Sequence, residues 1–290
     1  MSNFITGGCG FVGSYLTRRI GGTVYDNLSV PNAVMPKKRG WEADIRDMNT
    51  LVIAMNGHSV VWHLAASGDI AVGMKDTAQD LNNNTVGTRN VLEAMRLNGI
   101  SKIVFSSSAT YYGNQEGMMK EDMPPAAISL YGASKVAGEA LIKAYSHLFG
   151  IQAWVFRFGN VVGGSMGRGV IYDFINKLKK NPHRLEIIGD GKQEKPYFLV
   201  EDCVDGMICG LKYPPDTYNL APMTFTIVDD IAKIVIEEMG LHNVKLIHTE
   251  KPKWDVPIVK LNSDKIQKLG WKPSHTSDEA VRIATRRLLQ

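Results

Sequence analysis

Short apolar runs alternate with helix-like stretches over the first 160 residues of the chain. The runs predict strands at residues 4–6, 23–25, 40–43, 60–64, 103–106 and 153–158. Between them, apolar positions recur with the period of a helix at residues 11–20, 49–55, 81–98 and 130–149. Strands that alternate with helices form right-handed crossovers in a parallel sheet. The pattern therefore predicts an α/β fold with a doubly wound parallel sheet.

The last 130 residues carry a different pattern. Helix-period stretches lie at 169–180, 200–212, 227–239 and 277–289, and short strands are predicted at 185–188, 217–220 and 245–249. Prolines between these elements indicate a loop-rich region rather than a second doubly wound sheet. We therefore expect one domain over residues 1–160 and a smaller C-terminal α/β part over residues 161–290, from which the chain can cross back to the first domain.

Composition excludes several classes of protein. The chain has 290 residues, of which 44% are hydrophobic, so it can bury a sizeable core and does not have the composition of a disordered protein. No apolar run reaches the roughly 18 residues of a membrane span. The first residues lack the basic and then apolar pattern of a secretory signal. We expect a cytoplasmic protein with no membrane partner.

Charge and cysteine usage add less to the picture. The net charge is +4, from 33 basic and 29 acidic residues, and the basic clusters at 37–39 and 177–180 are short. A nucleic-acid partner is therefore not expected, whereas an anionic small molecule is compatible with the excess. Cys9, Cys203 and Cys209 show no metal-ligand or disulfide spacing. We expect no bound metal, and three cysteines buried as small apolar side chains.

A glycine-rich turn follows the first predicted strand. Gly8, Gly10 and Gly13 form the pattern G-x-G-x-x-G at the start of the first predicted helix. Such glycines let the backbone approach a pyrophosphate, which the positive end of the helix attracts. The motif predicts a Rossmann-type dinucleotide-binding domain over residues 1–160. The contacts expected from this turn are Gly7, Gly10, Phe11, Val12 and Gly13.

Asp26 ends the second predicted strand, 18 positions after Gly8. A carboxylate at this interval accepts hydrogen bonds from a ribose hydroxyl and repels a 2′-phosphate, which favours NAD over NADP as the cofactor. The alternative is that Asp26 and Asn27 only form a turn.

Tyr131 and Lys135 stand four positions apart at the start of a predicted helix and so share one face of it. The lysine charge stabilises a phenolate, which would let Tyr131 act as a general base. Ser106 and Ser108 end a predicted strand, at the edge of a parallel sheet where ligands bind. Together they predict a hydride-transfer site with Ser108, Tyr131 and Lys135 as catalytic residues. The alternatives are that the serines cap a turn and that Tyr131 belongs to the core.

At these residues the chain resembles the extended short-chain dehydrogenase/reductase family. Within it, the chain is most similar to the NAD-dependent nucleotide-sugar epimerases of the UDP-glucose (UDP-galactose) 4-epimerase type. The resemblance runs from Thr6-Gly7-Gly8 to the segment Leu-Gly-Trp-Lys-Pro at 269–273. The strand-end motif at 105–113 also matches, although Tyr111 stands where an aliphatic residue is usual.

The resemblance implies further contacts with the cofactor. Asp26 and Asn27 correspond to contacts with the adenosine ribose, and Asp44 and Ile45 to contacts with the adenine. The other cofactor contacts that it implies are Leu64, Ala65, Ala66, Asn84, Ser106, Tyr131, Lys135 and Phe158.

For the substrate, the resemblance implies a nucleotide-diphosphate sugar, most like a UDP-hexose, held mainly by residues 161–290. Two departures concern the diphosphate: Lys195 stands where the family has an arginine, and the segment 251–255 departs from an Arg-x-Gly-Asp pattern. A lysine lacks the two-pronged guanidinium. Val259 is small where a bulky side chain excludes N-acetyl sugars, which leaves N-acetylated substrates open. The implied substrate contacts are Ser108, Thr110, Tyr131, Asn160, Val170, Leu185, Ile187, Lys195, Lys251 and Lys253.

The reaction that the resemblance implies is 4-epimerisation through a transient 4-keto sugar. Ala109 and Thr110 occupy the positions of an acidic pair in the related dehydratases, which disfavours elimination of water. The alternatives are another nucleotide-sugar oxidoreductase or dehydratase of the same family, and a non-catalytic NAD-binding sensor. A homodimer is also expected, because the helices at 81–98 and 130–149 pair between subunits in the resembling enzymes. Packing on the sheet explains the same apolar residues.

Overall fold

The computed structural model describes residues 2–31, 33–252 and 255–290. It divides into two units between which the chain passes more than once. Unit 1 comprises residues 1–113, 124–157 and 207–218, and unit 2 comprises residues 114–123, 158–206 and 219–290.

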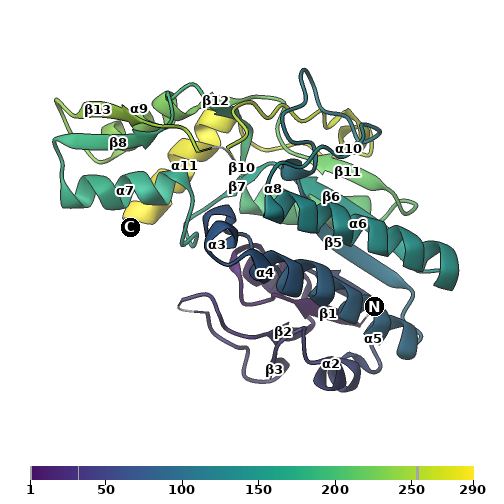
Figure 1. Cartoon of the computed structure of the whole chain (residues 1–290). Coiled ribbons are helices and arrows are strands. Elements are labelled where there is room, and N and C mark those ends of the chain that lie inside the picture. Colours follow the sequence, from purple (N-terminus) through teal and green to yellow (C-terminus); the bar gives the residue numbers. More distant parts are fainter. Residues whose placement is uncertain (1, 32, 253–254) are drawn as a thin grey trace. The chain divides into compact units, whose positions relative to one another are not determined.

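Unit 1 is built on a seven-stranded sheet of order β11-β6-β5-β4-β1-β2-β3 (Figure 1). The parallel sheet confirms the predicted α/β class. The chain leaves β1 towards β2 on one side and returns to β4 on the other, which creates the switch point where α/β proteins bind ligands. The strands are β1 (Asn3–Thr6), β2 (Thr23–Asp26), β3 (Gly40–Glu42), β4 (Val60–His63), β5 (Lys102–Ser108), β6 (Gln152–Phe158) and β11 (Thr217–Leu220).

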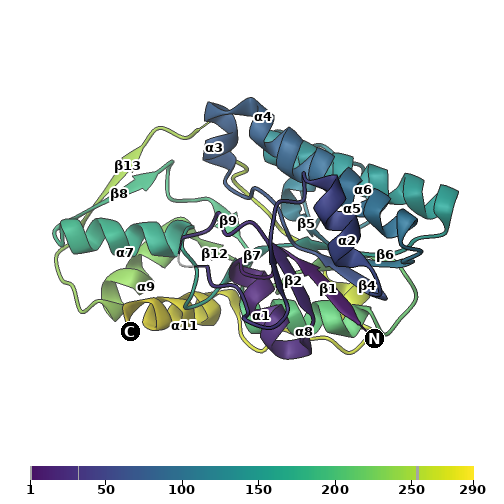
Figure 2. The same ribbon diagram turned by 90° about the horizontal axis from the view of Figure 1, so that it is seen from below.

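Helices cover both faces of this sheet. Figure 2 shows α2 (Met48–Met55), α5 (Gly87–Leu97) and α6 (Leu130–Phe149) along one face and α1 (Phe11–Ile20) on the other. Side chains of α2, α5 and α6 form one apolar core with β1, β4 and β5.

Helix ends explain why the predicted bounds of α1 and α6 are correct. The α1 helix stops at Gly21, whose φ of 63° is a conformation that side chains disfavour. The first turn of α6 is capped by Ser129, whose Oγ accepts from the amide of Gly132 at 3.0 Å, and the helix ends at Gly150 with φ 70°.

The predicted helix at 81–98 is only partly correct. Residues Leu81–Val86 form the π-helix η1, and α5 follows it. Two short helices precede it, α3 (Ile70–Lys75) and α4 (Thr77–Asp80), each capped by an aspartate at its first turn. Helices this short show no measurable apolar period, and a π-turn leaves no mark in that period.

Unit 2 contains three small sheets and a cluster of helices. The parallel pairs are β7 (Asn160–Val162) with β10 (Tyr197–Leu199) and β8 (Arg184–Ile188) with β13 (Lys245–Thr249), and β9 (Glu194–Lys195) pairs antiparallel with β12 (Thr226–Ile227). The predicted helices correspond to α7 (Val170–Lys180), α8 (Val200–Gly210), α9 (Val228–Glu238) and α11 (Ser277–Leu289), whereas α10 (Asp264–Gln267) was not predicted. The strands β7, β9 and β12 are too short to leave a period in the sequence.

The cysteine prediction needs correction. Cys203 is buried as expected, but Cys9 and Cys209 are only partly buried. Cys9 lies in the turn after β1, and Cys209 lies in the last turn of α8. Among the described residues, no helix is both long and apolar enough to cross a membrane.

His63 ends β4 and is buried between two threonines. Its Nδ1 lies 2.7 Å from Thr6 Oγ1, and its Nε2 lies 3.0 Å from Thr88 Oγ1. The Thr88 hydroxyl donates to the carbonyl of Asn84, so it accepts from the ring. The ring hydrogen is therefore on Nε2, and Nδ1 accepts from Thr6. Burial, with a smaller contribution from the Lys135 charge, lowers the pKa of His63 to about 3.

This histidine makes the stability of the fold depend on pH. The pKa in the folded state, about 3, lies below the ordinary value of 6.5, so between these values the unfolded chain binds a proton that the folded protein does not. Stability is therefore lost as the pH falls through this window, by up to about 1.4 kcal/mol per pH unit from this group. We expect the stability difference between the wild type and His63→Gln to shrink on acidification in urea-unfolding experiments. His58→Gln, at a half-buried ring in the same unit, is the control. A difference that stays constant with pH would contradict the assignment.

Candidate functional site

The predicted cofactor and catalytic residues of unit 1 gather where parallel strands end. β2, β1, β4 and β5 are neighbours in the sheet. The glycine turn follows β1, Asp26 closes β2, Leu64 follows β4 and Ser108 closes β5. Because the strands run parallel, these positions share one edge of the sheet.

The glycine turn packs backbone against backbone. Gly7 has a φ of 71°, and a Cβ on it would lie 2.5 Å from the amide nitrogen of Ala65. A Cβ on Gly13 would lie 2.0 Å from the carbonyl oxygen of Gly7. Neither position has room for a side chain. The glycine turn can therefore pack closely against the first turn of α1 and against the segment after β4 only because these residues are glycines.

This turn fits the phosphates of a dinucleotide. The α1 helix begins at Phe11 after the N-cap residue Gly10, and no described side chain caps its first amides. Its first turn, which contains Phe11 and Val12, holds no acidic residue. Uncapped amides at the positive end of a helix are a binding site for phosphate.

The carboxylate of Asp26 fits the ribose of the same ligand. One oxygen accepts from the Cys9 amide at 2.9 Å and the other from the Leu28 amide at 2.8 Å. A carboxylate accepts up to about four hydrogen bonds, so each oxygen retains capacity for a hydroxyl. The two backbone bonds fix the carboxylate at the edge of the glycine turn, where the sequence placed it.

Cys9 lies within this turn. Its Sγ donates to the carbonyl of Val34 at 3.4 Å and lies 3.9 Å from the sulfur of Met35. Burial and the nearby charge of Asp26 raise the pKa of the Cys9 thiol to about 11.

The residues expected at the adenine form a polar cluster that the sequence only partly predicted. Arg46 binds both oxygens of Asp44, at 2.9 and 2.8 Å, and Asn27 donates to Asp44 at 2.9 Å. The hydrogen bond from Arg46 is the main reason that the pKa of Asp44 falls to about 2. Ile45 is 7% exposed and packs against Gly87, so its side chain belongs mostly to the core.

Leu64, Ala65 and Ala66 line the edge after β4. Leu64 donates its amide to the carbonyl of Thr6 at 3.1 Å, and the Ala65 amide reaches Thr6 Oγ1 at 3.4 Å. These bonds tie the segment to β1 beside the glycine turn.

Tyr131 and Lys135 lie in the first turns of α6, as predicted. Lys135 is 3% exposed, and its Nζ donates to the carbonyl of Ser106 at 2.8 Å. The ammonium lies 5.8 Å from the centre of the Tyr131 ring and 5.0 Å from that of Phe105. Ser106 is held in turn by its hydroxyl, which donates to the carbonyl of His63 at 3.1 Å. The lysine charge is thus fixed between the end of β5 and the tyrosine.

The hydroxyl of Ser108 is oriented by its neighbour. Its Oγ accepts from the amide of Thr110 at 3.2 Å and from the Thr110 hydroxyl at 2.9 Å. A hydroxyl has a single hydrogen to donate, and these two bonds leave that hydrogen for another acceptor.

The unusual Tyr111 has a structural explanation. The guanidinium of Arg157, at the end of β6, lies 3.5 Å from the centre of the Tyr111 ring. Arg157 also binds both oxygens of Glu139, at 3.0 and 2.7 Å, and donates to the Tyr112 hydroxyl at 2.8 Å. Tyr111 thus covers a buried ion pair, which the sequence did not predict.

The predicted substrate residues of unit 2 are more varied in their surroundings. Asn160 lies in β7 and its amide group donates to the Pro196 carbonyl at 3.3 Å. Leu185 and Ile187 are fully buried, so only their backbone can meet a ligand. The remaining substrate positions are Val170 at the start of α7 and the exposed Lys251, while Lys253 lies outside the described residues. Phe158, predicted as a cofactor contact, ends β6.

Lys195 is already paired. Its ammonium lies 2.9 Å from Asp255 Oδ1, and the amide of Gln193 donates to the other oxygen of Asp255 at 3.2 Å. Val259, where a small side chain was noted, is buried, whereas Ile258 next to it is 49% exposed.

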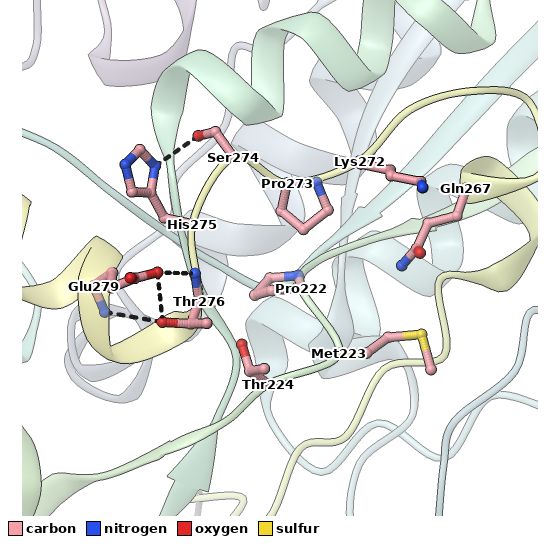
Figure 3. A pocket seen from close by; sticks show the side chains of 10 residues that line it. All are labelled: Pro222, Met223, Thr224, Gln267, Lys272, Pro273, Ser274, His275, Thr276 and Glu279. Atoms are coloured by element: carbon pink, nitrogen blue, oxygen red, sulfur yellow. Dashed lines mark hydrogen bonds between the residues drawn. The ribbon is translucent and has the colours of Figure 1, made fainter.

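A pocket of about 400 Å³ in unit 2 is lined by none of the predicted site residues (Figure 3). Its polar groups largely bond to one another: Glu279 accepts from the amide and hydroxyl of Thr276, both at 2.8 Å, and Ser274 pairs with His275. The lining residues are Pro222, Met223, Thr224, Gln267, Lys272, Pro273, Ser274, His275, Thr276 and Glu279. Among the described residues, no cluster of His, Cys, Asp or Glu has the arrangement of a metal site.

Asp80 and Arg46 are the site-adjacent charges that sequence reasoning missed. Arg46 stands two positions after Asp44, and Asp80 stands one helical turn before Asn84. These spacings were the available signals, but neither pattern is specific without the structure.

Comparison with known proteins agrees with this geometry. The NAD dependent epimerase/dehydratase family matches residues 3–221. A protein of Methanocaldococcus jannaschii, provisionally named UDP-glucose 4-epimerase, is 32% identical over 96% of this chain and 95% of its own length.

Solved structures have the same fold. The crystal structure of a UDP-galactose 4-epimerase is 35% identical with a TM-score of 0.89, and it covers 100% of this chain and 99% of its own. The UDP-glucose 4-epimerase of Thermus thermophilus in complex with NAD is 26% identical with a TM-score of 0.92, with the same coverage. From its glycine turn, its Tyr131–Lys135 pair and these matches, the chain belongs to the NAD dependent epimerase/dehydratase family.

Proposed function

We propose that this chain is an NAD-dependent 4-epimerase of UDP-hexoses. The observation that carries the proposal is the arrangement of Ser108, Tyr131 and Lys135, in which the lysine is buried at the end of β5. Ala109 and Thr110 follow the serine, so the positions that hold an acid in the dehydratases hold none here. Such a site suits oxidation and reduction at one carbon without elimination.

The residues of unit 1 would hold NAD through the glycine turn, Asp26 and the segment after β4. When bound there, NAD would supply a reversible hydride acceptor for the sugar carbon. Tyr131 takes the proton of the 4-hydroxyl, and the charge of Lys135 stabilises the phenolate that makes this possible. Ser108, whose hydrogen is left available by Thr110, orients the sugar oxygen towards Tyr131. The chain's own contribution is position and electrostatics.

The substrate proposal extends to unit 2. Asn160, Lys195 and Lys251 are proposed to hold the diphosphate, and the strand β8 the nucleotide base. The named relatives act on UDP-glucose or UDP-galactose, which supports a uridine nucleotide. N-acetylated UDP-sugars are a second substrate class to be tested in the same assay. We also infer a homodimer through α5 and α6, since Leu97, Leu148 and Phe149 on these helices are 55%, 67% and 48% exposed.

Tyr131→Phe removes the general base and keeps the ring. We expect kcat for interconversion of UDP-glucose and UDP-galactose to fall by about 10²–10⁴-fold, with little change in NAD binding. Chromatography of the sugar products measures the turnover, and the absorbance of reduced nicotinamide shows whether net oxidation occurs. Turnover near that of the wild type, or steady accumulation of reduced nicotinamide, would exclude the proposed reaction.

Asp26→Asn removes the charge that selects the ribose. A hydrogen bond to a charged group contributes about 1.5–3 kcal/mol, so NAD should bind about 10- to 100-fold more weakly, while NADP should lose much less. Calorimetric titration with both dinucleotides measures the change. Asp47→Asn, at the exposed cap of α2, is the matched control. Equal NAD affinity in the Asp26 variant and the control would argue against this ribose site.

Lys195→Met tests the diphosphate contact. A diphosphate has to compete with Asp255 for the ammonium, and loss of the charge should raise KM for the UDP-sugar about tenfold, with kcat less affected. Lys195→Arg should restore or improve the wild-type KM, because its two-pronged group can serve both acids. Lys192→Met, at an exposed lysine in the segment before β9, is the control. An unchanged KM in Lys195→Met would place the diphosphate elsewhere.

A further inference from the structure

Asp80 is a buried acid that the proposed mechanism does not use. It is the last residue of α4, it is 1% exposed, and its Oδ2 has no hydrogen-bond partner among the described residues. Gly73 of α3 faces this oxygen so closely that a Cβ there would lie 2.3 Å from it. A buried carboxyl with an unsatisfied oxygen costs stability, so its presence calls for a reason.

The other oxygen of Asp80 belongs to the hydrogen-bond network of Asn84. The Asn84 side-chain nitrogen lies 3.3 Å from Asp80 Oδ1, 2.9 Å from Ser134 Oγ and 2.9 Å from the carbonyl of Ser67. The amide oxygen of Asn84 accepts from the Ser67 amide at 2.7 Å, which fixes the orientation of the group. Ser134 Oγ donates in turn to the carbonyl of Tyr131 at 2.7 Å. A continuous path of bonds therefore leads from Asp80 to the backbone of the proposed base.

The π-helix η1 makes this path possible. It begins directly after Asp80 and places Asn84 within reach of Asp80, Ser67 and α6 at once. The side-chain nitrogen of Asn84 has two hydrogens for three acceptors, and the bond to Asp80 is the longest. π-Helical turns are rare in proteins as a whole, and those that occur are often found at functional sites.

Asp80 also acts on the site through its charge. Burial raises the pKa of Asp80, whereas the nearby Ser67 hydroxyl and the charge of Lys135 oppose that rise. The other charged group that faces it is Asp69, at the cap of α3. His63, which faces Lys135 from β4, is kept neutral by its burial. Asp80, when ionised, and Lys135 are therefore opposite charges that interact within the site.

We propose that Asp80 is a positioning residue for the Tyr131–Lys135 pair. It holds Asn84 under the first turns of α6, and its charge offsets part of the effect of Lys135 on Tyr131. Without the charge of Asp80, the phenolate of Tyr131 would form at lower pH and would be a weaker base for a sugar hydroxyl. The inference rests on the proposed function only in naming Tyr131 as the base.

Asp80→Asn tests the charge while keeping the shape. The titration of Tyr131 should shift by about one pH unit to lower pH. It is measured as the near-ultraviolet phenolate absorbance of the protein minus that of the same protein with Tyr131→Phe, in the absence of any sugar. The acid limb of kcat/KM should shift in the same direction. Asp76→Asn, which makes the same charge change at the exposed cap of α4, should leave both unchanged.

Gly73→Ala tests the position without changing any charge. The added methyl group pushes the carboxyl away from its place, and alanine favours the helix, so α3 itself should not be weakened. We expect a shift of the Tyr131 titration in the same direction, and little further shift when Asp80→Asn is added to Gly73→Ala. Met74→Ala, at an exposed position of α3, is the control.

The outcomes separate this inference from the proposed function. If the titration shifts but the wild type converts no UDP-sugar, the proposed function fails and the role of Asp80 stands. If the wild type is an epimerase and neither variant shifts the titration, Asp80 is only structural and the inference is overturned. Thermal unfolding of each variant shows whether its fold is impaired. If Asp80→Asn is unstable, the titration of Tyr131 in Gly73→Ala tests the inference in its place.

Discussion

The burial of one ammonium group is the constraint around which the candidate site is organised. Lys135 is almost completely enclosed, and a charge in that position is tolerated only when polar groups replace the water that it has lost. The carbonyl of Ser106 supplies a direct hydrogen bond, and the rings of Phe105 and Tyr131 present their electron-rich faces. The end of β5 and the start of α6 are thereby held in one fixed relation.

The same charge determines the state of the groups nearby. A protonated His63 would add a second buried cation, and the ring is instead neutral between two threonine hydroxyls whose hydrogens are ordered by their other bonds. The same ammonium charge also acts on Asp80, whose pKa it lowers against the effect of burial. A buried ammonium thus lies near a neutral imidazole and an enclosed acid, and its charge acts on the pKa of both His63 and Asp80.

The sequence predicted those parts of the fold and site whose partners are close along the chain. The glycine turn, Asp26 and the Tyr131–Lys135 pair are local patterns, and the alternation of strands and helices was sufficient for the sheet. Lys195 shows where such reasoning ends, because its partner Asp255 is 60 positions away and no local pattern joins them. Similarly, the interruption of the helix at 81–98 by a π-turn depends on the packing of Asn84 against α6, which no periodicity records.

The partial burial of Cys9 could not be predicted for a related reason. A small apolar residue after a strand is usually buried, but Cys9 lies in the glycine turn at the edge of the sheet, where few side chains cover it. Leu185 and Ile187 show the opposite case: their alternation correctly predicts a strand, and that same alternation turns both side chains into the core of unit 2.

The carboxylate of Asp26 has a second consequence for the turn that it borders. A thiol reacts with oxidants and electrophiles as its thiolate, and partial burial together with the negative charge of Asp26 makes that form of Cys9 unfavourable. The acid that is proposed to bind a ribose therefore also makes the neighbouring thiol less reactive. One carboxylate thus serves two ends in the glycine turn: the charge proposed to recognise a hydroxyl group also disfavours the reactive form of a cysteine.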